Sequence, residues 1–456
     1  MTIGPTIAPS IAAARAALVR GELDPQTLVR ECLHRLADSE SVVRAWVHID
    51  AERSLDEARR LDPGERDAPL WGIPLGVKDV IDVVGMPTTA SSKVLAGNVA
   101  TADAAVVGSL RRAGAVILGK TNTHEFAYGC VTPPTVNPWD ARRIPGGSSG
   151  GSAAAIAEGH CLGALGTDTA GSIRIPSALC GVCGLAPRPG RVWLDGVIPL
   201  APSLDVVGPM AGSVEDLVIL WQAMTGKEVH GREPQVVAAP RDALPALDRD
   251  VAAGYEAALD VLVSAGLRVR GADVPAFQAF DVPRGRVLMH EALEVHRSRG
   301  WWPARADAYS EETASYLDRA GTTLTAEIAD AARRRCAELA AGLHAVLDDA
   351  DLIATPTVPC TAPTHEEAAR PGVGARRPVV IRLTRIPGPV NLARLAALSI
   401  PCGLGDDALP IGLQLIGRSE EVVLAAGRAF ERETDWHLRR PARNRQDRKE
   451  VSSHAT

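Results

Sequence analysis

Residues 146–176 read GGSSGGSAAAIAEGHCLGALGTDTAGSIRIP. A loop rich in Gly and Ser leads into residues 152–159, whose composition favours a helix. Residues 161–166 form a short apolar run that is typical of a buried strand. The segment GTDTAGSIRIP then predicts a second loop that feeds a short helix. This alternation of loops, helices and a buried strand indicates an α/β fold.

The flanking sequence extends the same pattern. Residues 72–82, GIPLGVKDVID, are apolar and bounded by Gly and Pro, which predicts a buried strand. Residues 103–113 have a helical period, and residues 115–120 predict the next strand. Residues 8–62 are predicted to be helical, with Ser10, Asp24 and Asp50 at helix starts. Further predicted helices cover residues 214–225, 250–265, 324–349 and 420–434, and late strands are predicted over residues 350–359 and 410–417.

The composition is that of an ordinary globular protein. Of 456 residues, 46% are hydrophobic and 23% are charged, so a large core can form. The net charge is −6 and no basic stripe occurs, which argues against a nucleic-acid partner. We find no signal peptide and no run of about 18 apolar residues, so we expect no membrane association and a cytoplasmic location. The eight cysteines lie mostly in apolar runs, which predicts buried reduced thiols.

Lys78 is a candidate base. It lies within the apolar strand predicted over residues 72–82, and burial would lower the pKa of its amine. Asp79 would point to the opposite face of the strand and need not neutralise it. This segment alone favours a lysine that reaches solvent or pairs with Asp79.

Two loops carry candidate hydroxyls. Ser148 and Ser149 lie among four glycines, which allow a ligand to approach the backbone closely, although a flexible turn has the same composition. Ser172 follows a turn whose backbone N–H groups can converge on an oxyanion, and Gly171 permits a positive φ there. Asp168 and Arg174 flank this turn and are expected to pair across it. Together the segments offer a nucleophile, a relay hydroxyl, a base and an oxyanion hole.

These residues resemble the amidase signature family. The resemblance runs from about Trp71 to Gly226 and resumes at DLIATPTVP and PIGLQLIGRSEE, and the glycine-serine stretch joined to GTDTAGSIRIPS is its most specific part. The resemblance implies one α/β domain over residues 1–440, with a central mixed sheet covered by helices on both faces. Within it we distinguish N-terminal helices (8–62), a catalytic core (71–226), a variable middle (227–350) and a C-terminal core (351–440). Residues 441–456 are polar and predict a disordered tail.

The resemblance also implies roles for particular residues. Ser172 would be the acylated nucleophile, Lys78 the base, and Ser148 the relay serine after a cis peptide bond. The oxyanion donors would be the N–H groups of Thr169, Ala170, Gly171 and Ser172. The residues implied to bind the substrate are Ala127, Tyr128, Gly129 and Ser149. The family usually has glycine where this chain has Ala170, and a positive φ there would strain the backbone by about 1 kcal/mol.

Other motifs fit the chain less well. Residues 146–150 match G-x-S-x-G, which would make Ser148 the nucleophile with a histidine such as His437, but RRIP rather than a hydrophobic strand precedes them. Cys180 and Cys183 lack a second pair for zinc, and His124-Glu125 is not followed by the second histidine of H-E-x-x-H. The glycine-serine stretch lacks the Lys-Ser/Thr ending of a loop that binds nucleotide phosphates. We therefore expect neither a metal nor a cofactor.

The sequence predicts a hydrolase that cleaves a small carboxamide through an acyl-enzyme. The alternative is the glutaminase subunit of a tRNA-dependent amidotransferase, which belongs to the same family. A binding protein that kept the fold without the chemistry is a third hypothesis. The family suggests a homodimer. Whether Trp301, Trp302, Tyr309 and Tyr316 wall the substrate channel or belong to the core is left open by the sequence.

Overall fold

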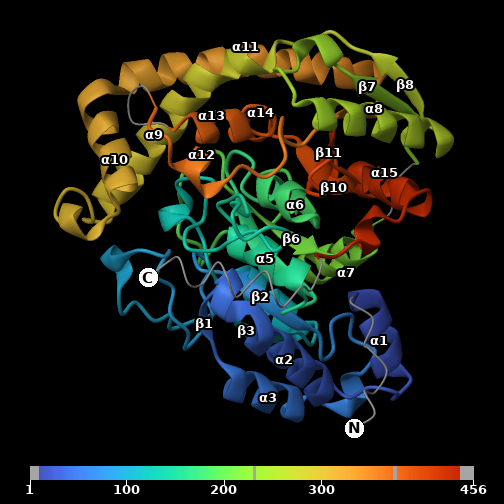
Figure 1. The fold of residues 1–456 in the computed structure, drawn as a ribbon. Coiled ribbons are helices and arrows are strands. Elements are labelled where there is room, and N and C mark those ends of the chain that lie inside the picture. Colours follow the sequence, from blue (N-terminus) through green and yellow to red (C-terminus); the bar gives the residue numbers. More distant parts are fainter. Residues whose placement is uncertain (1–9, 230–232, 373–376, 442–456) are drawn as a thin grey trace.

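Eleven strands form one mixed sheet in the order β1-β3-β2-β4-β6-β5-β10-β11-β9-β7-β8. The computed structural model describes residues 10–229, 233–372 and 377–441. The strands are β1 (Trp46–Ile49), β2 (Pro74–Lys78), β3 (Val116–Thr121), β4 (Gly163–Asp168), β5 (Cys183–Ala186), β6 (Val206–Ala211), β7 (Val236–Ala239), β8 (Arg268–Gly271), β9 (Leu352–Pro356), β10 (Ala396–Leu404) and β11 (Pro410–Gly417). In Figure 1 the blue strands β1–β3 lie at the lower end of the molecule and β7 and β8 at the upper end.

Fifteen α-helices of the described chain surround this sheet. They are α1 (Ile11–Val19), α2 (Pro25–Val43), α3 (Ala51–Arg60), α4 (Ala105–Arg112), α5 (Gly150–Glu158), α6 (Arg174–Cys180), α7 (Val214–Thr225), α8 (Arg249–Ser264), α9 (Asp281–Ser298), α10 (Glu311–Thr323), α11 (Ala326–Asp349), α12 (His365–Ala369), α13 (Pro378–Thr384), α14 (Gly388–Leu392) and α15 (Glu420–Arg432). The long helix α11 runs across the top of the view in Figure 1, with α9 and α10 beside it.

The side chains of β3 show that helices cover both faces of the sheet. Val116 and Leu118 pack with residues of α2, α5 and α6, whereas Ile117 packs with residues of α4, α7 and α15. Because successive strand residues point to opposite faces, these two helix groups lie on opposite sides of the sheet. The predicted α/β class with a central mixed sheet between helices is confirmed.

The first helices begin where the sequence predicted. The side chains of Ser10, Asp24 and Asp50 each accept a hydrogen bond from the backbone N–H three residues later. This satisfies a donor that the first helical turn leaves unpaired. Between α2 and α3, however, residues 46–49 form β1 at the edge of the sheet, so the prediction of helices throughout residues 8–62 is wrong there.

Other boundaries also differ from the prediction. The strand predicted over residues 72–82 ends at Lys78, because Asp79 turns away to accept hydrogen bonds from the N–H groups of Thr89 and Ser91. The sequence did not predict β5, β6, β7, β8 or β10, nor α9 and α10. The predicted tail, residues 441–456, lies outside the described residues except for residue 441. The described residues hold no helix long and apolar enough to span a bilayer.

The close approach of β1 and β3 generates a prediction for stability. A Cβ added at Gly119 would overlap the carbonyl oxygen of His48, which belongs to the backbone of the neighbouring strand and cannot move aside. We expect Gly119→Ala to lower the free energy of unfolding by about 1–3 kcal/mol. Gly271→Ala is the matched control, because nothing lies within 4 Å of a Cβ at that strand glycine. Calorimetric unfolding checks this, and equal melting temperatures for the two variants would contradict it.

Candidate active site

The candidate residues meet where β2 and β4 end. These two strands are parallel neighbours, with Val77 opposite Leu165. Their carboxyl ends therefore lie at the same edge of the sheet, where open α/β sheets commonly bind ligands. Lys78 is the last residue of β2, and Thr167 and Asp168 end β4. The two loops that carry Ser148 and Ser172 lie beside these strand ends.

The Lys78 amine is buried and contacts two hydroxyls. Its Nζ lies 2.6 Å from Ser148 Oγ and 2.7 Å from Thr167 Oγ1. The residue is 0% exposed, and burial lowers the pKa of its amine to about 7, although the carboxylates of Asp168 and Asp205 favour the charged form. A substantial fraction of the amine is therefore uncharged at neutral pH.

Asp79 does not pair with Lys78, although the segment taken alone favoured that pairing or a lysine that reaches solvent. Its Oδ1 lies 3.2 Å from the Nζ of Lys120, and both side chains are fully buried. Lys120 also donates to the Pro87 carbonyl and to Thr88 Oγ1. A second buried lysine thus satisfies the carboxylate, which leaves Lys78 with hydroxyl partners.

The Ser148 loop is held in an unusual backbone conformation. The peptide bond between Gly147 and Ser148 is cis, as the resemblance implied. The Ser148 carbonyl accepts hydrogen bonds from the His124 N–H and from Thr132 Oγ1. A Cβ at Gly147 would lie 2.5 Å from Thr132 Oγ1, so glycine is needed there for close packing. The stretch is an ordered loop and not a flexible turn.

The turn before Ser172 is shaped by the Asp168 carboxylate. This carboxylate accepts the N–H groups of Gly171 at 2.7 Å and Ile173 at 3.0 Å. The positive φ of the turn falls on Gly171, at 114°, and not on Ala170, so the alanine imposes no strain of that kind. Because the Gly171 N–H already donates within the turn, it does not point at a substrate in this geometry. The remaining candidates for oxyanion donors are the N–H groups of Thr169, Ala170 and Ser172.

Asp168 and Arg174 form the predicted ion pair. Arg174 Nη2 lies 2.9 Å from Asp168 Oδ1, and both side chains are 0% exposed. Burial acts to raise the pKa of Asp168, but Arg174 and the backbone donors lower it to about 2. Arg174 also donates to the Pro387 carbonyl, Gln414 Oε1 and Asn391 Oδ1. The pair therefore joins the Ser172 turn to the C-terminal part of the chain.

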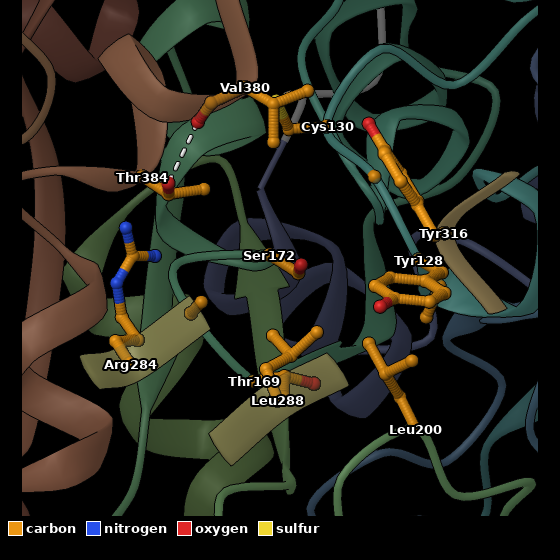
Figure 2. Close-up of a pocket in the computed structure, with 13 residues that line it drawn as sticks. Tyr128, Cys130, Thr169, Ser172, Leu200, Arg284, Leu288, Tyr316, Val380 and Thr384 are labelled. Atoms are coloured by element: carbon orange, nitrogen blue, oxygen red, sulfur yellow. Dashed lines mark hydrogen bonds between the residues drawn. The ribbon is translucent and has the colours of Figure 1, made fainter. Parts of the chain in front are cut away.

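A cavity lies beside Ser172. Figure 2 shows Ser172 near its centre, with Tyr128 and Tyr316 on one side and Arg284 and Thr384 on the other. The described lining residues are Ala127, Tyr128, Gly129, Cys130, Thr169, Ala170, Ser172, Leu200, Arg284, Leu288, Tyr316, Val380 and Thr384. Their side chains are mostly apolar or aromatic, and Arg284 is the charged one among them. A mainly apolar pocket with a few polar groups is a common form of ligand-binding site.

Of the four residues predicted to bind the substrate, three line the cavity and Ser149 does not. Ala127, Tyr128 and Gly129 line the cavity with Ser172. Ser149 is fully buried and bonds to the backbone of Thr167 through its hydroxyl, while its N–H donates to the Ser172 carbonyl. Ser149 thus links the two loops, and it is not among the described residues that line the cavity.

Several lining residues were not predicted from the sequence. Arg284 and Leu288 come from α9, Tyr316 from α10, and Val380 and Thr384 from α13. Tyr316, whose role the sequence left open, lines the cavity. Trp301 and Tyr309 instead pack around the Phe126 ring, and Trp302 packs against Tyr309. No motif marked these residues, because their part in the site depends on where α9, α10 and α13 pack.

Three residues of the segment 126–132 have left-handed backbone conformations. Phe126 and Ala127 have φ values of 51° and 59°, and Thr132 has 58°, in the left-handed region that non-glycine residues rarely adopt. Gly129 leaves room for the His124 ring, which a Cβ would overlap. Such strain is typical of functional sites, where the surrounding structure holds it in place.

The competing motifs find little support. No β-strand occurs between residues 122 and 149, so the strand–turn–helix of a nucleophile elbow is not formed at Ser148. All eight cysteines are buried, as predicted, and Cys180 and Cys183 contact Pro145 and Glu431 respectively. Within the described ranges, no group of three or more His, Cys, Asp or Glu residues is placed to hold a metal ion.

Comparison with known proteins points to one family. The family model described as Amidase matches residues 27–423. A glutamyl-tRNA(Gln) amidotransferase chain of Chloroflexus aggregans is 37% identical to this one, over 95% of this chain and 98% of that protein. A solved structure described as an amidase has a TM-score of 0.85 at 32% identity, over 93% of this chain and 99% of that one. For the corresponding amidotransferase chain of Thermotoga maritima the TM-score is 0.75 at 29% identity, over 92% and 94% of the two chains.

The buried Asp168–Arg174 pair generates a prediction for stability. Arg174→Met would leave a buried carboxylate without its cation, and we expect the free energy of unfolding to fall by about 3–5 kcal/mol. Arg142→Met is the control, because Arg142 pairs with Asp140 at 2.9 Å but is 78% exposed. We expect little change from this variant. Denaturant unfolding measures both, and a similar midpoint for the two variants would argue against the central role of the buried pair.

Proposed function

The chain belongs to the amidase family, and on this premise we propose that it hydrolyses a small carboxamide by means of Lys78, Ser148 and Ser172. That it is an amide-hydrolysing enzyme follows from the family. The residue roles and the freestanding activity are our proposal. The observation that carries it is the buried Lys78 amine at 2.6 Å from the Ser148 hydroxyl, beside a cavity that Ser172 lines.

Acylation is the first half of the proposed reaction. Ser172 Oγ attacks the amide carbonyl while its proton passes to Ser148 Oγ, and the Ser148 proton passes to the Lys78 amine. The N–H groups of Thr169, Ala170 and Ser172 donate to the oxyanion of the tetrahedral intermediate. The proton then returns along the same path to the leaving nitrogen, which departs as ammonia or an amine.

Deacylation repeats these steps with water. Water attacks the ester formed by Ser172, and its proton moves through Ser148 to Lys78. Collapse of the second tetrahedral intermediate releases the carboxylic acid and returns the proton to Ser172 Oγ. Thr167 supports the relay because its hydroxyl lies 2.7 Å from Lys78 Nζ and holds the amine in place.

Covalent labelling tests the nucleophile and the base together. We expect a fluorophosphonate to modify Ser172, at a rate that rises with pH through about 7 and then levels off, because only the uncharged Lys78 amine accepts a proton. Ser172→Ala should abolish labelling, and Lys78→Met should slow it by at least ~100-fold and remove the pH dependence. Peptide mapping by mass spectrometry identifies the modified serine.

Ser152→Ala is the matched control for this experiment. Ser152 belongs to the same glycine-serine stretch, but its hydroxyl bonds to Thr121 Oγ1 and to the Leu165 carbonyl. We expect it to be labelled like the wild type. Modification of Ser148 instead of Ser172, or no modification of a folded protein, would refute the proposed roles.

The second candidate function is that of the glutaminase component of an amidotransferase, and the sequence similarity to the Chloroflexus aggregans protein favours it. The cavity argues for the first candidate. The described residues that line it include the Arg284 guanidinium but no carboxylate. Glutamine carries an α-ammonium group, and burying that cation without an anionic partner is unfavourable.

Two amides that differ only in that ammonium group separate the candidates. Glutaramate is glutamine without its α-amino group. We expect the purified chain alone to hydrolyse glutaramate with a kcat/KM at least ~10-fold above that for glutamine, because of the unpaired ammonium. Release of ammonia measures both reactions. A preference for glutamine, or activity that requires a further protein component, would establish the second candidate instead.

A further inference from the structure

A buried carboxylate joins two parts of the cavity wall. Asp205 comes directly before β6 and is 9% exposed. Its Oδ1 accepts a hydrogen bond from Thr169 Oγ1 at 2.6 Å, and its Oδ2 accepts the N–H groups of Leu200 at 2.8 Å and Ala201 at 3.0 Å. Thr169 and Leu200 both line the cavity with Ser172, and Figure 2 shows them below Ser172 in that view. One side chain therefore holds two segments of the wall that are separate in sequence.

The two oxygens of this carboxylate have different partners. The bonds to Oδ2 close the turn before β6, which is an ordinary use of aspartate. The bond to Oδ1 reaches across to the next strand, because β4 and β6 are antiparallel neighbours with Asp168 opposite Val206. A hydrogen bond to a charged oxygen is stronger than one between neutral groups. It restrains Thr169, the residue with which the Ser172 turn begins.

Asp205 is mostly charged at neutral pH. Burial raises the pKa of its carboxyl to about 6, although the Thr169 hydroxyl and the N–H groups of Leu200 and Ala201 favour the charged form. Glu291 on α9 is a further ionisable group that acts on Asp205, and its charge also raises this pKa. Because the resulting pKa lies below 7, most of the Asp205 carboxyl is ionised at pH 7.

This charge acts on the candidate base. Burial lowers the pKa of the Lys78 amine, and the carboxylates of Asp168 and Asp205 oppose that effect. His124 is another titratable group near the lysine, and the pKa of its ring is lowered by burial and also by the Lys78 charge. In the proposed reaction the amine becomes an ammonium when the proton from Ser172 arrives. A nearby anion in a buried site stabilises the charge that forms there.

We propose that Asp205 is a positioning residue of the reaction: its carboxylate fixes Thr169 beside the oxyanion and stabilises the ammonium that forms on Lys78. This inference rests on the proposed function, because it assigns a further residue to the same site. Asp205 acts through Thr169 and through its charge, and it is not among the described residues that line the cavity. Asp168 shapes the Ser172 turn from within, and Asp205 restrains the same turn from the neighbouring strand.

Asp205→Asn removes the charge and keeps the shape of the side chain. We expect the midpoint of the pH dependence of fluorophosphonate labelling at Ser172 to move from about 7 to lower pH by ~0.5 or more, because the Lys78 ammonium loses a nearby anion. At high pH, labelling should be slower by ~10-fold or more, because Thr169 is held less firmly and the lysine is a weaker base. In glutaramate hydrolysis the loss should lie mainly in kcat and not in KM.

Asp216→Asn is the matched control. Asp216 is 0% exposed, it accepts the Ala12 N–H at 2.9 Å, and burial raises the pKa of its carboxyl to about 6. It lies on α7 and is not among the described residues that line the cavity. We expect the wild-type midpoint and a labelling rate within ~3-fold of the wild type, because distant sites act independently. A shift of the same size in both variants would overturn the proposal.

Variants of Thr169 test the contact from its other side and keep the test valid if Asp205→Asn does not fold. Thr169→Val removes the hydroxyl and leaves the Asp205 carboxylate, and we expect it to slow labelling at high pH by ~10-fold. Thr169→Ser keeps the hydroxyl and should recover most of this loss. Thermal unfolding shows whether each variant is folded.

The outcomes separate this inference from the proposed function. If folded Asp205→Asn keeps the wild-type midpoint, or if folded Thr169→Val is labelled as fast as the wild type, the inference about Asp205 is wrong and the proposed function stands. If Ser172 of the folded wild-type protein is not labelled and no amide is hydrolysed, both are wrong.

Discussion

The carboxylate of Asp168 is the interaction on which the candidate site depends. It ends β4, accepts the N–H groups of the turn that carries Ser172, and pairs with the buried Arg174 guanidinium. Asn391 and Gln414, more than 200 residues later in the chain, complete the network around Arg174. A single charged pair thus sets the conformation of the turn that carries Ser172 and connects it to β11 and α14 in the C-terminal part of the chain. Because both charges are buried, neither can leave without a large energetic cost.

Around this pair, small residues allow backbone segments to approach closely. A Cβ at Gly171 would lie 2.6 Å from Pro387 Cγ, and one at Gly150 would lie 2.7 Å from Thr132. These contacts bring together three segments that are separate in sequence: the glycine-serine loop, the Ser172 turn and the residues before α14. The same dense packing excludes water from Lys78 and thereby lowers the pKa of its amine. The close approach of these segments therefore accounts both for the dense packing and for the lowered pKa of the Lys78 amine.

The sequence predicted those features of the structure that depend on local sequence patterns. The helix caps at Ser10, Asp24 and Asp50, the strand that carries Lys78, and the pairing of Asp168 with Arg174 all depend on residues close in sequence or on distinctive motifs. The prediction failed where tertiary context decides. β1 is only four residues long, and its pairing with β3 cannot be read from its own sequence. The family resemblance implies that Ser149 binds the substrate. In the structure its hydroxyl donates to the Thr167 carbonyl in β4. Arg284 lies in a helix without a motif and reaches the site only through the packing of α9.

One side of the cavity wall and the proposed reactive groups come from different parts of the chain. Lys78, Ser148 and Ser172 lie on or beside β2, α5 and β4, whereas Arg284, Tyr316 and Thr384 belong to α9, α10 and α13. Point substitutions in these three helices can therefore change which molecules are accepted without disturbing the strands that hold the lysine. A protein built in this way can diversify during evolution by altering its recognition surface alone. Its descendants would share one chemical mechanism while acting on unrelated compounds.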